Sequence, residues 1–140
     1  RTSPLMKVIP VDAGSEMMMQ SIIEGYYLGL ISDQNAGRKG TKASFFGKSV
    51  SVPKGTGIFH LKTNSPILLG FCILSPDLNY NLSFEQLSFE GLSDNTDEAI
   101  KVINQKYTLL LEQEIKKYPH QYFWFHRKWP KNNYKGLASF

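Results

Sequence analysis

The feature that most constrains the fold is a long amphipathic segment at residues 94–118. Apolar or aromatic residues recur in it at spacings of three and four: Ile100, Ile103, Tyr107, Leu110, Leu111, Ile115 and Tyr118. Acidic residues occupy its first turn, Lys116 and Lys117 its last, and Pro119 follows as a stop. The pattern predicts one helix with a wide apolar face, which is stable only when other elements pack against it.

The segments before this helix predict an α/β fold. Residues 15–24 form a short amphipathic pattern that ends at Gly25, and residues 55–63 predict one or two helical turns. Strands or hairpins are predicted at residues 5–11, 26–31, 42–53, 66–74 and 80–89. In the last of these the apolar positions change faces, which indicates a bulge or break. We expect one structural unit, a mixed sheet flanked by helices, with the long helix in its C-terminal part.

A central strand is expected at residues 26–31. This stretch is apolar on both faces apart from Gly29, as in a largely parallel sheet that is covered on both sides. Asp33 and Gln34 follow its carboxyl end. Because open α/β sheets hold ligands beyond the carboxyl ends of their strands, these two side chains are the first candidates for a site. The alternative for Asp33 is an aspartate that caps a turn.

The loop at residues 32–51 is rich in side chains that can carry chemistry. These are Arg38, Lys39, Lys42, Phe45 and Phe46, followed by Gly47-Lys48-Ser49. The closing Gly-Lys-Ser looks like the end of a phosphate-binding P-loop. The glycine that opens such a loop would stand at position 42, which is a lysine, so a nucleotide-binding loop is not expected.

Composition excludes several classes of protein. A chain of 140 residues that is 41% hydrophobic has enough apolar content for one globular domain and is not disordered. Cys72, the single cysteine, lies in an apolar run, so we expect buried packing, no disulfide and no metal-ligand cluster. No apolar run reaches the roughly 18 residues that a membrane span needs. Sixteen Lys and Arg against twelve Asp and Glu give a net charge of +4, which suits an anionic partner.

The segment PHQYFWFHRKW at residues 119–129 combines five aromatic rings with two histidines and two cations. Three roles fit it: a stacking surface for nucleic acid, a belt at a membrane interface, or a chain segment that packs its rings and exposes its charges. His120 and His126 have no cysteine or carboxylate at ligand spacing, so no metal site is expected.

Several short motifs follow one another along the chain. They are Arg1, Lys7-Val8-Ile9-Pro10, Asp33-Gln34, Phe45-Phe46-Gly47, Thr56-Gly57, Lys62-Thr63, the strand from Pro66, and Pro119-x-Gln121-Tyr122-x-Trp124-x-His126-Arg127-Lys128. In this order and spacing they resemble the bacterial lipid A biosynthesis acyltransferases, the late lauroyl and myristoyl transferases, which are related to the mycobacterial phosphatidylinositol mannoside acyltransferases. The resemblance runs from Arg1 to about Lys131, and it is specific because separate motifs combine.

The resemblance implies an acyltransferase of lipopolysaccharide biosynthesis with a glycerophospholipid-acyltransferase-like sheet. It would transfer a fatty acyl chain from acyl carrier protein, its co-substrate, to a hydroxyl of a lipid A precursor. Its expected place is the cytoplasmic face of the bacterial inner membrane, with the membrane surface as a further partner. No cofactor, no metal and no nucleic acid are implied.

The catalytic signature of this family, His-x-x-x-x-Asp/Glu, does not occur in the sequence. At the required offset from His60, His120 and His126 stand Ser65, Phe125 and Lys131. In the family the signature lies before the point that Arg1 matches. We therefore interpret residues 1–140 as the C-terminal part of a single acyltransferase domain, with the N-terminal part and a membrane anchor absent. The chain alone is then expected to be inactive, because its general base is missing.

The resemblance also implies roles for individual residues. Arg1 matches an arginine near the active-site mouth, where a guanidinium can hold phosphate or polarise the acyl group. Asp33 matches an acid that can orient that arginine or a substrate hydroxyl, and Gln34 is its companion. Substrate binding is expected from the cations Arg38, Lys39, Lys42, Arg127 and Lys128, which reach anionic headgroups, and from Phe45 and Phe46, which wall the acyl path. The alternatives are a solvated loop for the cations and core packing for the two phenylalanines.

Two other functions stay open. A phosphatidylinositol mannoside or other phospholipid acyltransferase would share the chemistry and differ in the acceptor. A non-enzymatic nucleic-acid-binding module would use the basic, aromatic segment at residues 119–129, and its binding to single strands would depend steeply on salt.

Overall fold

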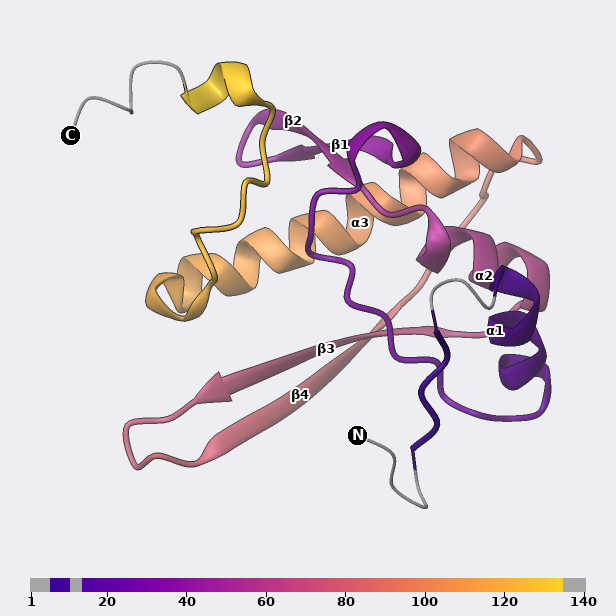
Figure 1. The fold of residues 1–140 in the computed structure, drawn as a ribbon, viewed down its shortest axis with the longest axis horizontal. Helices are drawn as coiled ribbons and strands as arrows, with labels where there is room; N and C mark the ends of the chain where they lie inside the picture. Colours follow the sequence, from indigo (N-terminus) through magenta and orange to yellow (C-terminus); the bar gives the residue numbers. More distant parts are fainter. Residues whose placement is uncertain (1–5, 11–13, 135–140) are drawn as a thin grey trace.

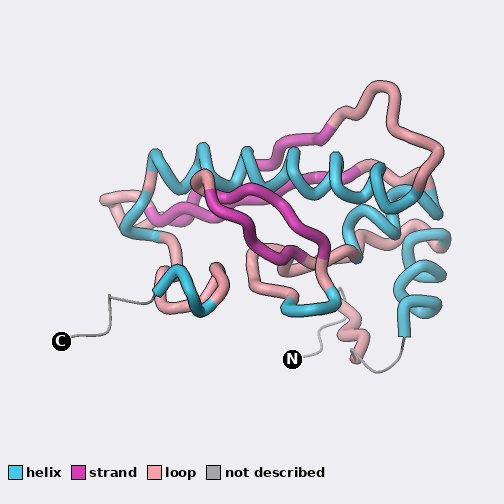
Figure 2. Tube along the Cα trace, turned by 90° about the horizontal axis from the view of Figure 1, so that it is seen from above, coloured by secondary structure: helices cyan, strands magenta, loops and turns pink. Residues whose placement is uncertain are grey.

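The computed structural model describes residues 6–10 and 14–134, which form a mixed α/β fold around one long helix. This helix, α3 (Thr96–Lys117), lies between two antiparallel hairpins, as Figures 1 and 2 show. One hairpin is β1 (Thr41–Phe45) with β2 (Lys48–Val52), and the other is β3 (Ile67–Leu74) with β4 (Tyr80–Leu87). The predicted α/β class with a long helix in the C-terminal part is confirmed.

Two shorter helices lie together at one end of α3. They are α1 (Gly14–Ile23) and α2 (Gly55–Thr63), as predicted to within one residue at each end. Short 3-10 turns occur at Gly37–Lys39, Pro119–Gln121 and Lys131–Tyr134. Gly25 ends α1 with a φ of +87°, and the amides of Gly25 and Tyr26 bond back to the carbonyls of Ile22 and Ser21. Within the described ranges, no helix combines the length and the apolar character needed to cross a bilayer.

The N-terminus of α3 is capped by a side chain. Oδ1 of Asn95 accepts hydrogen bonds from the amides of Asp97 (3.0 Å) and Glu98 (3.2 Å), which satisfies two donors that the first turn leaves without helical partners. At the other end, Pro119 begins a separate 3-10 turn. The helix predicted at residues 94–118 is therefore confirmed.

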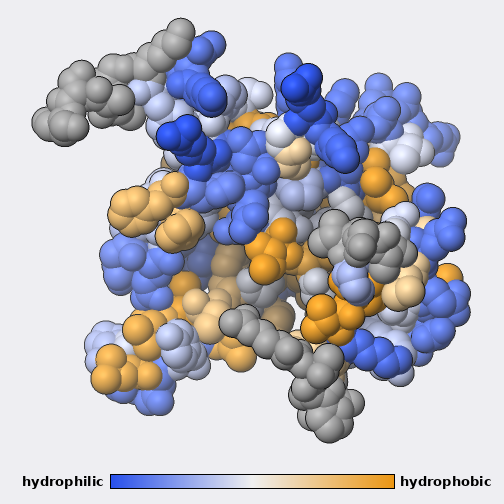
Figure 3. Space-filling model, in the orientation of Figure 1, coloured by the Kyte–Doolittle hydropathy of each residue, from blue (hydrophilic) through white to orange (hydrophobic). Residues whose placement is uncertain are grey.

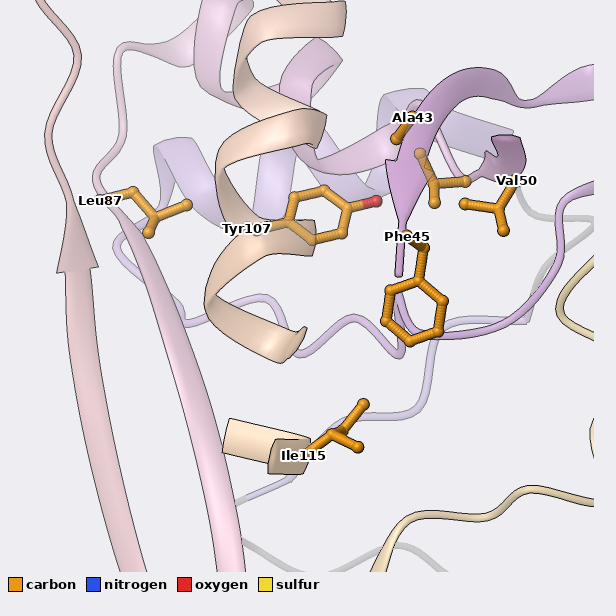
Figure 4. Packing of buried hydrophobic residues seen from close by; sticks show 7 residues of the cluster. Ala43, Phe45, Val50, Leu87, Tyr107 and Ile115 are labelled. Carbon is orange, nitrogen blue, oxygen red and sulfur yellow. The ribbon is translucent and has the colours of Figure 1, made fainter. Parts of the chain in front are cut away.

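The core lies between α3 and the β1–β2 hairpin and reaches the end of β4. Its buried members are Ala43, Phe45, Val50, Val52, Leu87, Tyr107 and Ile115. Figure 4 shows Tyr107 of α3 with Leu87 on one side and the hairpin residues Phe45 and Val50 on the other. Full burial of an aliphatic or aromatic side chain contributes roughly 1.5–3 kcal/mol. The helix and the two hairpins are thus held together by the apolar stripe that the sequence places on α3.

Polar side chains of α3 also bind the backbone of the first hairpin. Gln105 accepts a hydrogen bond from the amide of Ser44 (2.7 Å) and donates one to its carbonyl (3.1 Å). Glu112 accepts a hydrogen bond of 2.8 Å from the amide of Phe46, at the turn between β1 and β2. The predicted hairpin at residues 42–53 is confirmed, and its outer edge is fixed to the helix.

The prediction of a central strand at residues 26–31 is wrong. This segment runs as irregular chain outside both sheets, and Tyr27 and Ile31 are 94% and 80% exposed. A strand needs a neighbour that supplies a hydrogen-bonded ladder, and both sheets here are hairpins of consecutive strands. The strand predicted at residues 5–11 is also not formed: within residues 6–10 only Met6 takes part in an isolated bridge, and residues 5 and 11 lie outside the described part.

The strands predicted at residues 66–74 and 80–89 are present as β3 and β4, but their environment differs from the prediction. They pair without a bulge, and alternate residues of β3 are exposed, including Cys72. Leu87 is buried whereas Leu82 and Phe84 are exposed, because odd and even positions of a strand lie on opposite faces. The change of apolar positions therefore marks a change of face at the end of β4, where it reaches the core.

Candidate active site

A cavity of about 640 Å³ lies between the segment that follows α1, strand β3 and helix α3. Its walls are mainly apolar and include Leu28, Leu30, Ile67, Leu69, Phe71 and Leu111. Figure 3 shows apolar side chains near the middle of this face of the molecule, where the segment after α1 runs in Figure 1. A pocket of this size and character suits a small or elongated apolar ligand.

Asp33 lies on the wall of this cavity and is half-buried. Among the described residues, no hydrogen bond reaches its carboxylate. The turn that follows is capped by Asn35, whose Oδ1 accepts a hydrogen bond of 2.8 Å from the amide of Gly37. The side chain that caps this turn is therefore that of Asn35.

Two tyrosines, Tyr107 of α3 and Tyr122 of the aromatic segment, share the cavity wall with Asp33. Burial, followed by the negative charge of Asp33, raises the pKa of Tyr107 well above its usual range and that of Tyr122 to about 12. Both hydroxyls therefore stay protonated at neutral pH and can donate hydrogen bonds. The hydroxyl of Tyr107 is buried and has no hydrogen-bond partner within the described part of the chain.

Lys128 also lies beside Asp33, but it is inside the protein. The residue is 1% exposed, and its Nζ donates hydrogen bonds to the backbone carbonyls of Asp33 and Gln34. Burial lowers the pKa of Lys128 to about 8, an effect that the nearby Asp33 charge opposes. An ammonium enclosed in this way does not reach an anionic headgroup, so the expectation that Lys128 binds one is wrong.

The other predicted cations are on the surface. Arg38 and Lys39 form the 3-10 turn Gly37–Lys39, Lys42 lies on β1, and Arg127 precedes Lys128; all four are exposed. Gln34 is exposed as well, and Arg1 lies outside the described residues.

The loop that carries Arg38 and Lys39 is held against β2. Oγ of Ser51 donates a hydrogen bond of 2.6 Å to the carbonyl of Gly37, and the amide of Ala36 donates one of 3.2 Å to the carbonyl of Ser51. A Cβ atom at Gly40 would lie 2.2 Å from Oγ of Ser51, so only glycine fits this close approach. The two cations therefore stand on an ordered turn.

Phe45 and Phe46, which were expected to wall the acyl path, pack with other aromatic rings. Phe45 is completely buried, and its ring centroid is 4.7 Å from that of Phe46 and 5.5 Å from that of Trp129. Neither phenylalanine lines the cavity. The alternative of core packing holds for Phe45, because strand alternation directs it toward α3. The walls of the cavity come from β3 and α3 instead.

The aromatic segment at residues 119–129 packs some of its rings and exposes others. Tyr122 and Trp129 pack against the core cluster, whereas Phe123 and Phe125 are 67% and 91% exposed. Gln121 fixes the start of the segment to the end of β3: it accepts a hydrogen bond from the amide of Leu74 and donates one to its carbonyl, both of 2.8 Å.

The histidines make different contacts. His60 lines the cavity, and its Nδ1 is 2.8 Å from the carbonyl oxygen of Ser65. His126 accepts a hydrogen bond of 2.8 Å at Nε2 from the amide of Asn35. Within residues 6–10 and 14–134, no three His, Cys, Asp or Glu side chains gather in a group that could hold a metal ion.

Sequence reasoning missed several residues of this site. Asn35 follows Asp33-Gln34 directly, and asparagine is a residue type that often caps a turn with its side chain. Tyr107 and Leu111 were assigned only to the apolar stripe of α3, although they also line the cavity. Tyr122 was visible as part of a motif, but its position next to Asp33 depends on chain folding that no local pattern encodes.

Comparison with known proteins identifies the family of the chain. A family model described as bacterial lipid A biosynthesis acyltransferase matches residues 1–131. Among curated proteins, none matches this chain.

Proposed function

The chain belongs to the family of bacterial lipid A biosynthesis acyltransferases, and we propose that it takes part in transferring a fatty acyl chain from acyl carrier protein to a hydroxyl of a lipid A precursor. Membership of the family indicates acyl transfer in general. That acyl carrier protein is the donor and a lipid A precursor the acceptor is our proposal. The observation that carries it is the apolar cavity with Asp33 on its wall.

The cavity suits the hydrocarbon part of such a donor. Leu69 and Phe71 of β3 and Leu111 of α3 offer apolar walls from opposite sides. Each methylene group that leaves water for such walls contributes roughly 0.8 kcal/mol. An acyl chain bound there places its polar carbonyl end where the wall becomes polar, and Asp33, Tyr107 and Tyr122 lie on that wall.

The reaction requires a base, an oriented acceptor and a partner for developing negative charge. The acceptor oxygen attacks the thioester carbonyl carbon, a C–O bond forms and the C–S bond breaks, while the acceptor proton leaves to a base and ends on the departing thiolate. Asp33 can hold the acceptor or orient a cation near it. The protonated tyrosine Tyr122 can donate a hydrogen bond to a carbonyl or acceptor oxygen. We further propose that the base is a histidine of the family's His-x-x-x-x-Asp/Glu signature, a pattern that residues 1–140 do not contain.

The exposed cations suit the anionic partners of this reaction. Arg38 and Lys39 lie on the turn that follows Asn35, and the backbone carbonyl of Arg127 accepts a hydrogen bond of 3.1 Å from the side chain of Asn35. The two basic segments therefore meet next to Asp33. We assign them to the phosphorylated acceptor at the cytoplasmic face of the inner membrane, with acidic acyl carrier protein as the donor.

The test is an acyl-transfer assay on the full-length gene product. Acyl carrier protein thioester and a lipid A precursor are supplied, and mass spectrometry detects the acylated product. Replacing Asp33 by Asn keeps the shape and removes the charge, so kcat should fall on the order of ten- to a thousandfold. Asp77→Asn, in the exposed turn between β3 and β4, is the matched control and should leave kcat unchanged.

Two results would count against this proposal. If the wild-type protein acylates only phosphatidylinositol mannosides or other phospholipids, the acceptor is wrong and the acyl-transfer chemistry stands. If it acylates no acceptor at all, or Asp33→Asn keeps the wild-type kcat and loses only thermal stability, the catalytic assignment fails.

A further inference from the structure

A buried lysine joins the C-terminal aromatic segment to the chain at Asp33. Lys128 is 1% exposed, and its Nζ donates hydrogen bonds to the carbonyl oxygens of two successive residues, Asp33 and Gln34. The ammonium also lies 5.6 Å from the ring centroid of Phe45. Enclosing an ammonium is unfavourable unless polar partners replace its water, and two carbonyls and an aromatic face do so here. The ammonium of Lys128 therefore interacts with these protein groups and not with solvent.

The residues next to Lys128 bind the same stretch of chain. The amide of Asn35 donates to Nε2 of His126 (2.8 Å), and the side-chain Nδ2 of Asn35 donates to the carbonyl of Arg127 (3.1 Å). Three successive residues, 126–128, therefore hold three successive residues, 33–35. We call this arrangement the 126–128 clamp.

The clamp is joined to the hydrophobic core of the fold. Trp129, which follows it, donates a hydrogen bond of 3.2 Å from Nε1 to the carbonyl of Phe45, and its ring packs on the buried ring of Phe45. Phe45 in turn lies in the core formed with α3. The chain at Asp33 is thereby connected, through the clamp and Trp129, to β1 and α3. The segment before it, residues 26–31, has no strand partners in the described part of the chain.

We propose that Lys128 is a positioning residue for acyl transfer: through the backbone carbonyls of Asp33 and Gln34 it fixes the direction in which the carboxylate of Asp33 faces the cavity. The inference rests on the proposed function, because it gives Lys128 a role in the reaction that Asp33 serves. The carbonyl of Asp33 lies in the peptide plane that joins Asp33 to Gln34, and the carbonyl of Gln34 lies in the next plane. Holding both fixes the backbone on the C-terminal side of the Asp33 Cα and so limits where its side chain can go. A site built in this way is ordered before the substrate arrives.

Two measurements on the full-length gene product test the inference. Lys128→Met keeps most of the length and apolar character of the stem and removes the ammonium. Lys101→Met, an exposed lysine of α3 outside the site, is the matched control. If Lys128→Met does not fold, Lys128→Gln replaces it, because the glutamine amide keeps two donors without the charge.

The first measurement is hydrogen exchange of backbone amides. In Lys128→Met, the amides of Asn35, Ala36 and Gly37 should exchange about tenfold faster or more, since each is held within the clamped turn. The amides in the middle of α3 should keep their wild-type rates. Unchanged rates at Asn35 to Gly37 would overturn the clamp.

The second measurement is steady-state acyl transfer. Lys128→Met should lower kcat about tenfold or more and change KM for the acyl donor by less than about threefold, because the lysine touches no substrate. Combined with Asp33→Asn, it should lower kcat no further than Asp33→Asn alone. An active enzyme whose kcat does not change, or an additive double variant, would overturn the positioning role. If the wild type transfers no acyl group, the proposed function fails, and hydrogen exchange still decides whether Lys128 orders the chain at Asp33.

Discussion

The backbone amide of Asn35 donates a hydrogen bond of 2.8 Å to Nε2 of His126, across 91 positions of sequence. Because Nε2 accepts, the ring proton of a neutral His126 lies on Nδ1. This bond places the aromatic C-terminal segment beside the turn that follows Asp33. In the motif His126-Arg127-Lys128, each residue therefore makes a hydrogen bond to the chain at residues 33–35, and the motif also carries positive charge.

The first prediction separates the acceptor role of His126 from its bulk. His126→Ala removes the acceptor and should lower the free energy of unfolding of the full-length gene product by about 1 kcal/mol. His126→Gln carries an oxygen near the position of Nε2 and should recover most of that loss. Denaturant unfolding of the two variants measures the difference; equal losses would show that Nε2 contributes nothing.

The second prediction concerns the pH dependence of stability. The pKa of Lys128 is lowered to about 8 in the folded protein, so between pH 8 and 10 the unfolded chain binds more protons at this residue. Stability therefore rises with pH across that window, by about 2 kcal/mol for this group, and is independent of pH only well below pH 8, where both states are protonated. Lys128→Met should lack this rise, which denaturant unfolding at pH 8 and pH 10 can detect.

The pH range of that experiment has an upper limit, set by two tyrosines. Tyr107 and Tyr122 have raised pKa values in the folded protein, Tyr122 to about 12, so the unfolded chain loses these protons first above about pH 10. The two tyrosines therefore reduce stability as pH rises beyond that point, opposite to Lys128. Comparing wild type with Lys128→Met at each pH removes their contribution, and parallel curves from pH 8 to 10 would contradict the assignment.

Local patterns predicted the helices and hairpins well. Residues 94–118 show the apolar spacing, the acidic start and the proline stop of α3, and each of these signals acts within a few residues. The apolar spacing did not predict a buried polar stripe on the same helix, which is formed by residues four positions apart: Asn104, Thr108 and Glu112. Their partners include the carbonyl of Pro53 and the amide of Phe46, which pattern reading cannot assign in advance.

Tertiary contacts decided what the patterns could not. Residues 26–31 have the composition of a buried strand, yet without a ladder partner they remain irregular and largely exposed. Lys128 looked like a surface cation beside Arg127, but only one of these neighbours is exposed, because Nζ of Lys128 reaches carbonyls more than ninety positions away. Asp33 is a candidate because of its place after a predicted strand, which is not formed. It lies on the cavity wall, and residues 126–128 bond to the chain at residues 33–35.

The third prediction uses the cavity. Leu69 of β3 is half-buried on the cavity wall, and replacing it by Trp fills part of the space that we assign to the acyl chain. The full-length Leu69→Trp variant should shift its preference toward shorter acyl donors. Its kcat/KM for the longest donor should fall at least about tenfold, because that factor corresponds to the free energy of burying one or two methylene groups.

A matched tryptophan tests whether the effect belongs to the cavity. Leu82 of β4 is 67% exposed and does not line the cavity, so Leu82→Trp should keep the wild-type preference. The measurement is competition between acyl carrier protein thioesters of different chain length. An unchanged preference in Leu69→Trp, with the protein folded, would remove this cavity from the acyl path.

The last prediction concerns the exposed cations of the turn beside Asp33 and of the start of β1. Arg38, Lys39 and Lys42 are exposed, and the bonds of Ser51 hold the turn in place, so their charges are available to a phosphorylated headgroup. Near an anionic surface each such charge contributes roughly 1 kcal/mol, and salt screens the effect. Replacing all three by Gln should raise KM for a bis-phosphorylated acceptor about tenfold or more, and the defect should shrink as ionic strength rises. A control with equal charge loss replaces Lys62, Lys101 and Lys116, which are exposed on α2 and α3, by Gln; if both triple variants raise KM equally, net charge and not this turn recruits the acceptor.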